Sequence, residues 1–234
     1  MASLYIWEEF PKLMKEAQSP SEADLTSAAG LLARMLEEIQ IPCGFMGGYA
    51  LKLRGSARNT TDIDIAVEAT MLQIREVLLK ESRLALPKGP TASVLRIFVL
   101  TGGEHECFNE LPSLVEHELM GLPSIRGSLG APTDVASGVE TLNVEIVAGN
   151  RLYPVLNIHN QMVSKLGAFW SRPGQNDKDY LDILFCLARY SGEIYSVRAQ
   201  LDYEQRDAFI ENFRRKNPGQ SQGVSKLKQI LGVV

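Results

Sequence analysis

The sequence contains no uninterrupted apolar stretch close to the ~20 residues that cross a bilayer as a helix. Its first ten residues, MASLYIWEEF, carry acidic side chains where a secretory signal carries basic ones followed by an apolar run. Both absences argue against a membrane-embedded or secreted protein. We therefore expect a cytoplasmic location, with the nucleus open to entry by diffusion.

Cysteine is scarce, and basic residues are not in excess. The three cysteines, Cys43, Cys107 and Cys186, are odd in number and widely spaced and include no C-x-x-C pair. This spacing predicts buried thiols rather than a disulfide framework or a zinc cluster. The 24 Lys and Arg residues stand against 28 Asp and Glu, a formal net charge of −4. This balance excludes a protein that coats nucleic acid with its whole surface.

What the sequence does contain is an alternation of helical and strand patterns over 234 residues, 45% of them hydrophobic, which is typical of a globular protein. Apolar residues recur at helical spacing over 19–40, with Ser19 as the expected N-cap, and again over TMLQIREVLLKES. CGFMGG, TDIDIAV, ASVLRIFVL and TLNVEIVAG have the composition of strands. This interleaving predicts an α/β or α+β fold.

The rest of the chain divides into an insertion and a helical end. The stretch 101–138 is rich in Gly, Pro and Ser and predicts a long insertion with at most short structure. After LYPVLNIHN the pattern is helical, and the last stretch, from NPGQ, is expected to hang off the body or to dock as a short helix. The expected organisation is a core over 1–152 and a helical region over 153–234.

The predicted strand TDIDIAV carries two carboxylates whose spacing suits a metal ion. Asp62 and Asp64 share one face, with their Cα atoms ~6.5–7 Å apart, and Ile63, Ile65 and Val67 share the other. Aspartate is disfavoured in strands, and two like charges repel unless a cation or solvent relieves them. Because Mg²⁺ takes one or two carboxylates together with substrate phosphates, the pair fits a metal site. A solvated strand face is the alternative.

Two glycines precede that strand by about a dozen residues. Gly47 and Gly48 lie between a predicted strand and the short helix YALKLRGS, where backbone N–H groups can approach a phosphate closely. A tight turn without a ligand is the alternative. Since one short helix links this turn to the strand of Asp62 and Asp64, the two features must lie near each other.

The motif GGYALKLRG…RNTTDIDI resembles the nucleotidyltransferase superfamily with the DNA-polymerase-β-like fold, whose pattern is a Gly-Gly or Gly-Ser turn followed by D-x-D or D-x-E. With PVLNIHNQMVSKLGAFWSRPGQNDKDYLDILFCL downstream, it is similar to the AbiEii-like branch and related minimal nucleotidyltransferases. That branch carries K-L-x-A, an arginine and K-D-x-x-D, here at 165–168, Arg172 and 178–182. The resemblance covers about 40–70 and 154–188 and implies a mixed β-sheet core flanked by helices.

The resemblance also implies a reaction: transfer of a nucleoside monophosphate from a nucleoside triphosphate such as ATP to an acceptor hydroxyl, with release of pyrophosphate and dependence on Mg²⁺ or Mn²⁺. It implies a third carboxylate on a strand neighbouring that of Asp62 and Asp64. Glu145 in LNVEIV is the candidate, and Glu140 or Glu104 could substitute.

Particular residues follow from the resemblance. The metal would be held by Asp62, Asp64 and Glu145. The nucleotide would be bound by Gly47, Gly48, Tyr49, Arg58, Thr61 and Lys165, and Arg54 could meet a triphosphate or an acceptor. The catalytic set would be Asp62, Asp64, Glu145, Lys165 and Asp182, the last as a partner that orients Lys165 or as an additional carboxylate.

Other functions stay open at the level of sequence. One is a catalytically silent nucleotide-binding or interaction module of the same fold. Another is a toxin-like enzyme that modifies transfer-RNA ends, because 212–234 contains Arg214, Arg215, Lys216, Lys226 and Lys228 and no acidic residue. Small molecules and protein hydroxyls are further acceptors, since acceptor choice depends on loops rather than on the fold.

Overall fold

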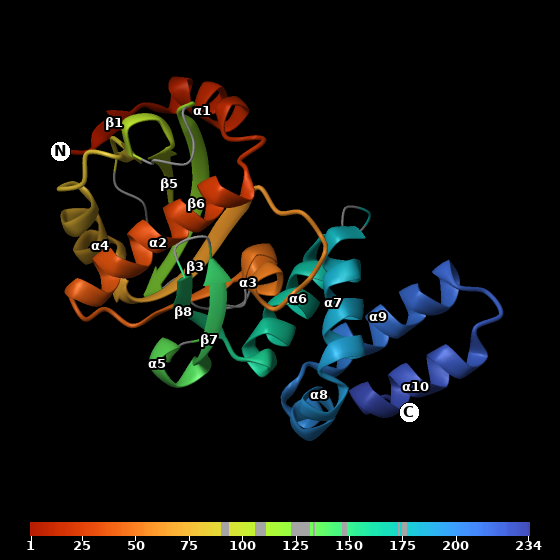
Figure 1. Ribbon diagram of the computed structural model, residues 1–234. Helices are drawn as coiled ribbons and strands as arrows, with labels where there is room; N and C mark the ends of the chain where they lie inside the picture. The colour runs from red at the N-terminus through yellow and green to blue at the C-terminus, as the bar shows by residue number, and fades with distance from the viewer. Residues whose placement is uncertain are drawn as a thin grey trace. The chain divides into compact units, whose positions relative to one another are not determined.

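The computed structural model describes residues 1–89, 94–105, 111–122, 132, 134–146, 149–172, 174 and 177–234. These residues form two compact units (Figure 1). Unit 1 contains the described residues up to Val155 and is built around a β-sheet. Unit 2 covers Leu156–Val234 and is helical.

The described part of unit 1 contains an eight-stranded mixed sheet with the order β1-β4-β5-β6-β3-β2-β8-β7. Its strands are β1 (Ser3–Tyr5), β2 (Cys43–Met46), β3 (Asp62–Thr70), β4 (Leu84–Pro87), β5 (Val94–Thr101), β6 (Ser113–Leu122), β7 (Val139–Ile146) and β8 (Gly149–Leu156). β1–β4, β6–β3 and β2–β8 are parallel, whereas β4–β5, β5–β6 and β3–β2 are antiparallel. β3 and β6 therefore lie side by side in the middle of the sheet.

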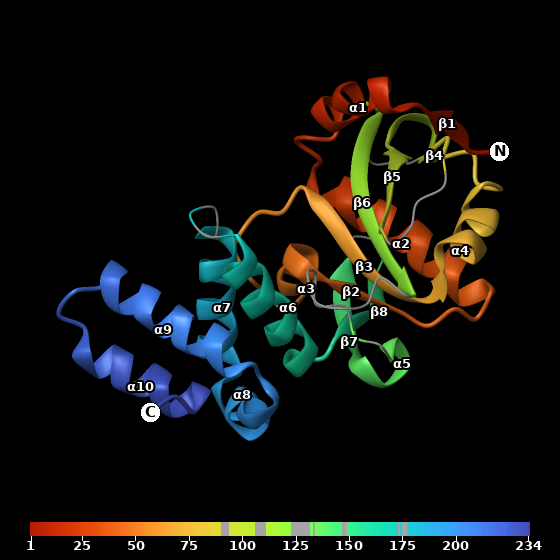
Figure 2. The ribbon, with the colours of Figure 1, turned by 180° about the vertical axis from the view of Figure 1, so that it is seen from behind.

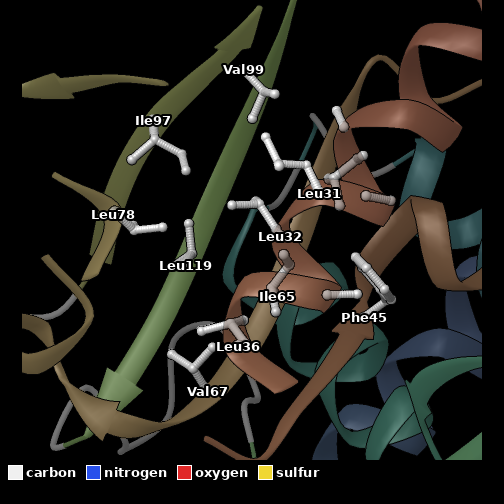
Figure 3. Close-up of a cluster of buried hydrophobic side chains, with 14 of the residues drawn as sticks. Leu31, Leu32, Leu36, Phe45, Ile65, Val67, Leu78, Ile97, Val99 and Leu119 are labelled. Carbon is white, nitrogen blue, oxygen red and sulfur yellow. The ribbon is translucent and has the colours of Figure 1, made fainter. Parts of the chain in front are cut away.

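One face of this sheet packs against the helices α2 (Glu22–Glu38) and α4 (Met71–Leu78). Leu32 and Leu36 lie one helical turn apart on α2, so both face the sheet. Figure 3 shows them beside Ile65 of β3 and Leu119 of β6, in the main hydrophobic core. Strict alternation along β3 sends its isoleucines into this core and its aspartates to the opposite face.

The opposite face carries a second, smaller apolar cluster. Tyr5 and Phe98 are buried there with their rings 5.7 Å apart, edge to face. Phe10, at the start of α1 (Phe10–Glu16), packs against both rings after a 3-10 turn over Trp7–Glu9. Leu114 of β6 also packs against this cluster. The next two residues of β6 on this face, Glu116 and Glu118, are acidic.

The described part of unit 1 also contains three short helical elements: α3 (Gly47–Leu53), α5 (Val135–Gly138) and a 3-10 turn over Gly103–His105. α3 contacts both β2 and β3, the two strands that its chain connects. This contact fixes the glycine turn at its start beside β3.

Unit 2 is an assembly of helices (Figure 2). They are α6 (Ile158–Ser171), α7 (Asp177–Arg189), α8 (Ser191–Val197), α9 (Tyr203–Lys216) and α10 (Ser221–Leu231), with a 3-10 turn over Arg198–Gln200. α6 packs against α7, α8 and α9, and α10 packs against α8 and α9. Leu166, Ile183 and Phe209 are fully buried between these helices. The last stretch of the chain thus docks as a helix.

The predicted α/β class is confirmed, and the predicted strands correspond to β2, β3, β5 and β7. The stretch 101–138 differs from the expectation, because it contains the ten-residue strand β6, which pairs with both β5 and β3. Within it, residues 106–110, 123–131 and 133 lie outside the described residues. The expectation was wrong because the glycines and prolines on either side of β6 dominate the composition of the stretch, although β6 itself alternates between apolar and acidic residues.

Two smaller expectations are also resolved. α2 is capped by Ser21 rather than Ser19, and Asp24 closes the capping box by accepting from the Ser21 N–H. Cys43 is half-buried and Cys186 is buried, while Cys107 lies outside the described residues. Within the described ranges, no helix has the length and apolar character needed to cross a membrane.

His117 of β6 faces the main core and is fully buried, so burial lowers the pKa of this imidazole to about 3. The unfolded chain takes up a proton near pH 6.5, whereas the folded chain does not, so falling pH favours unfolding in this window. We predict that, between pH 7 and pH 5, the free energy of unfolding falls by about 2 kcal/mol more in the unchanged protein than in His117→Leu. Urea unfolding of each protein at both pH values measures this; an equal loss in both proteins would contradict it.

Candidate functional site

The candidate site begins with the pairing of β3 and β6. The register places Asp62 opposite Glu116 and Asp64 opposite Glu118. Residues opposite each other on neighbouring strands project from the same face, so four carboxylates gather on the face that the main core does not occupy. Asp62, Asp64 and Glu118 are partly exposed, whereas Glu116 is 9% exposed.

Arg96 of β5 partly balances these acids. It lies opposite Glu118 in the register, and its Nη2 is 2.5 Å from Glu118 Oε1, while its Nη1 is 4.0 Å from Glu116 Oε1. Its guanidinium also lies 5.6 Å from the centre of the Phe10 ring. Burial is the main cause that raises the pKa of Glu116 to about 7; Glu118 and Asp62 act in the same direction, and Arg96 opposes them. Glu116 can therefore exchange a proton near neutral pH.

The glycine turn lies directly against these acids. Gly47 adopts a left-handed φ of 64°, and a Cβ atom there would overlap the Asp64 carboxylate. A Cβ atom on Gly48 would come within 2.5 Å of the Arg58 guanidinium and 2.8 Å of Thr60 Oγ1. Only glycine fits both positions without displacing these side chains. The turn thus leaves bare backbone beside Asp64 and Arg58.

Two residues in the loop before β3 shape this region. Thr60 is buried, and its hydroxyl donates to Asp62 Oδ1 at 2.9 Å, which orients that carboxylate. Arg58 donates to the carbonyl of Asn59 at 3.0 Å while its guanidinium lies over Gly48. Thr61, predicted to bind the nucleotide, is exposed, and the hydroxyl that contacts the acids belongs to its neighbour Thr60.

Two predicted residues lie elsewhere in unit 1. Tyr49 is 2% exposed, and its ring packs edge to face on Phe45 in the main core, so its side chain is part of the core. Glu145 is exposed on β7, which the sheet order places three strands from β3, or about 14 Å at the usual strand spacing. The expectation that its strand neighbours β3 is corrected: the neighbours of β3 are β6 and β2.

The remaining candidates in unit 1 are engaged in other contacts. Arg54 forms an ion pair with Glu140, and its side chain is 2% exposed. That ion pair links the end of α3 to the start of β7. It also engages Glu140, one of the two alternatives to Glu145 as the third acid. Glu104, the other substitute, is exposed and lies 3.9 Å from His105.

Lys165 of α6 is held in unit 2 by two acids of α7. Its Nζ lies 2.7 Å from Asp182 Oδ2 and 3.2 Å from Asp179 Oδ1, and all three residues are buried. Arg172 approaches the other side of Asp179 at 3.9 Å. These contacts favour the reading in which Asp182 orients Lys165, because the carboxylate touches the ammonium directly.

No three His, Cys, Asp or Glu side chains converge as a ready-made metal site within the described part of the chain. The donor chemistry of the face nevertheless fits Mg²⁺ or Mn²⁺. Asp62 and Asp64 supply hard carboxylate oxygens from one strand face, and Mg²⁺ completes its shell with water and substrate phosphates rather than with an all-protein cage. Gly47 lies directly against Asp64, so the glycine turn and these candidate cation ligands belong to one region of unit 1.

The residues that sequence reasoning missed are Glu116, Glu118, Arg96 and Thr60. A signal was present in LVEHELM, where Val115, His117 and Leu119 alternate with the two glutamates. This pattern repeats that of DIDIAV, with apolar residues on one face and acids on the other. Nothing local to either segment shows that the two strands pair.

Comparisons with known proteins give neither a matching family model nor a matching curated relative. Among solved structures, the chain is similar to the antibiotic-resistance factor ANT(2'')-Ia in solution, with a TM-score of 0.47, 14% identity, and coverage of 82% of this chain and 99% of that one. It is also similar to a protein of Thermotoga maritima described as a candidate nucleotidyltransferase, with a TM-score of 0.35, 13% identity, and coverage of 77% and 97%.

A third similar structure is a CCA-adding enzyme with ATP, with a TM-score of 0.31 and 13% identity; the match covers 94% of this chain and 49% of that one. The chain therefore spans about half the length of that enzyme. At these scores, the functional argument rests on the residues of this chain.

We predict that Gly47→Ala weakens Mn²⁺ binding at least tenfold, because the new methyl group displaces the Asp64 carboxylate. Gly55→Ala is the matched control, since Gly55 also has a left-handed φ, 91°, but has open space around it. Both changes should cost about 1 kcal/mol of stability through backbone strain. Mn²⁺ titration by electron paramagnetic resonance separates them, and equal affinities in the two variants would refute the contact.

We predict that Lys165→Met destabilises the protein by about 3–5 kcal/mol, because two buried carboxylates lose the cation that compensates them. The exposed Lys178→Met, one turn from Asp182, should change stability by less than about 0.5 kcal/mol. Urea unfolding measures both. Adding Asp182→Asn to Lys165→Met should recover part of the loss, and no recovery would argue against the ion pair.

Proposed function

We propose that this protein is a nucleotidyltransferase that uses Mg²⁺ or Mn²⁺ to transfer a nucleoside monophosphate from a nucleoside triphosphate to an acceptor hydroxyl, releasing pyrophosphate. The observation that carries the proposal is the register of β3 and β6, which sets Asp62 and Asp64 opposite Glu116 and Glu118. A single acidic strand is an ordinary surface feature. Two acidic strands in register beside a glycine turn provide both a cation site and a candidate base.

Asp62 and Asp64 would hold the cation, and Thr60 keeps Asp62 in place through its hydroxyl. When bound, the cation neutralises charge on the triphosphate and on the departing pyrophosphate. The protein's own contribution is to position the two carboxylates on one rigid strand, which limits the reorganisation required during the reaction.

The glycine turn would receive the triphosphate. Gly47 and Gly48 present backbone without side chains beside Asp64, and the Arg58 guanidinium lies over Gly48. A guanidinium can donate two parallel hydrogen bonds to one phosphate group. Arg58 therefore remains in the proposal, whereas Arg54 is held by Glu140 and Tyr49 by the core.

Glu116 takes the role of third acid that sequence reasoning gave to Glu145. Its carboxylate lies opposite Asp62 on the neighbouring strand, and its pKa near 7 suits a general base that accepts the proton of the attacking hydroxyl. Arg96 forms an ion pair with Glu118, the next residue of β6 on the same face, and so fixes the position of that carboxylate. Glu145 is exposed on β7, three strands from β3, and therefore lies outside this arrangement.

Lys165 and Asp182 enter the proposal as positioning residues of unit 2. Because Asp182 and Asp179 both contact the Lys165 ammonium, these two carboxylates largely compensate its positive charge. A direct contact of Lys165 with a nucleotide would raise KM in Lys165→Met beyond what its lost stability explains.

We predict that Asp64→Asn lowers the rate of label transfer from an α-labelled nucleoside triphosphate at least 10³-fold and that Glu116→Gln lowers it about 10²- to 10⁴-fold. Glu145→Gln, a matched change of an exposed strand glutamate, should alter the rate less than twofold. Each labelled nucleoside triphosphate is incubated with the protein, Mg²⁺ and a total cell extract, and label transfer is followed.

The variant order decides between the readings. A large loss in Glu145→Gln with none in Glu116→Gln would overturn the assignment of the third acid. Nucleotide binding without transfer to any acceptor in the extract would instead identify a nucleotide-binding module.

A further inference from the structure

Unit 2 contains a cavity that the proposed reaction does not use. It has a volume of about 720 Å³ and lies between the end of α6 and the second half of α9. Among its lining residues are Phe169, Trp170, Asp177, Asn212, Arg215 and Lys216. This volume falls within the range of sites that hold small organic ligands.

The aromatic lining has one buried and one accessible member. Phe169 is 4% exposed and packs against Phe209 with the rings 5.5 Å apart, so it belongs to the core of unit 2. Its neighbour Trp170 is 49% exposed. A large indole left accessible at a cavity offers a flat surface for another planar group, and stacking of this kind is how proteins hold bases without sequence preference.

The side-chain amide of Asn212 adds a hydrogen-bond acceptor that lacks a donor within the described residues. Its Oδ1 is buried and has no hydrogen-bond partner within the described part of the chain. A buried acceptor in this state is costly unless something donates to it. Asn212 lines the cavity, so a rotation of its amide would bring Oδ1 within reach of a ligand that carries an amino group on its planar ring.

Among the described basic residues that line the cavity, Arg215 is the one without an ion pair. Lys216 is paired with Asp177, and its ammonium lies 4.4 Å from the centre of the Tyr180 ring. Arg214 is paired with Glu211. Arg215 is exposed and has no ion-pair partner among the residues described, so its guanidinium is open to an anion from outside.

The charge of the helical unit supports an anionic ligand. Residues 156–234 carry eleven Lys and Arg against eight Asp and Glu, although the whole chain is acidic. Apolar or cationic ligands fit the cavity poorly, because the first would leave Asn212 unsatisfied and the second would face Arg215.

We propose that this cavity binds one nucleotide unit: an amino-bearing base on Trp170 and Asn212, and its phosphate on Arg215. The unit could be a free nucleotide or one residue of a single-stranded polynucleotide, since both present the same chemistry. Binding here requires neither a nucleoside triphosphate nor a metal, so the inference stands apart from the proposed reaction.

The experiment uses the 234-residue chain with Trp7→Phe, so that Trp170 is its single tryptophan. AMP, CMP, UMP, inorganic phosphate and the single strand (rA)8 are titrated without divalent cations, and binding is followed by tryptophan quenching and calorimetry. We expect AMP and CMP to quench Trp170 and to bind at least fivefold more tightly than UMP or phosphate. Tighter binding of (rA)8 with a steeper salt dependence would identify a polynucleotide as the source, and equal binding would identify the free nucleotide.

Variants at exposed positions test the contacts. Arg215→Gln should weaken AMP binding about tenfold, and Trp170→Leu should weaken it about 5- to 100-fold by calorimetry. Asp177→Asn should strengthen binding severalfold, because it releases Lys216 toward the phosphate; a merely structural role of Asp177 would not do so. Arg189→Gln, which removes an exposed cation at the end of α7, is the control and should change nothing.

Three results would overturn the inference. They are absence of AMP binding at low salt, binding of phosphate as tight as AMP, and AMP binding that survives both Trp170→Leu and Arg215→Gln. If Asp64→Asn abolished this binding instead, the nucleotide would sit at the glycine turn of unit 1, which would support the proposed reaction and reject the second site.

Discussion

The in-register parallel pairing of β3 with β6 is the constraint on which the rest of unit 1 depends. Strict alternation along both strands sends Ile63, Ile65 and Leu119 into one core. The same alternation gathers the carboxylates on the opposite face. A slip of one residue would reverse both faces together, so the burial that stabilises the sheet also fixes the acids in place.

That arrangement carries local costs which the fold as a whole offsets. Glu116 is buried among other acids, with a pKa raised to about 7, and Gly47 holds a left-handed turn against Asp64. Neither feature stabilises the sheet. Where a fold retains unfavourable charges and a glycine-only turn at one place, a functional requirement is the simplest physical reason.

Local patterns in the sequence were enough to predict β3 and the glycine turn, because alternation and spacing act over a few residues. They were not enough for the residue that we propose as the third acid. LNVEIV and LVEHELM both offer glutamates opposite apolar residues, and only the order of strands in the sheet decides which lies next to Asp62. That order depends on contacts between residues that are far apart in the sequence. Tyr49 shows the same limit, since it is buried in a core that includes residues as distant in the sequence as Tyr153 and Val155.

The central claim is that Asp62 and Asp64 hold a divalent cation on a triphosphate beside Gly47. Anomalous X-ray scattering from crystals grown with Mn²⁺ and a non-hydrolysable nucleoside triphosphate tests it most directly. The account predicts a manganese peak within about 2.0–2.3 Å of oxygens from both aspartates, with the phosphates against the Gly47-Gly48 backbone. A peak bound by neither aspartate, or a triphosphate seated away from this turn, would contradict it.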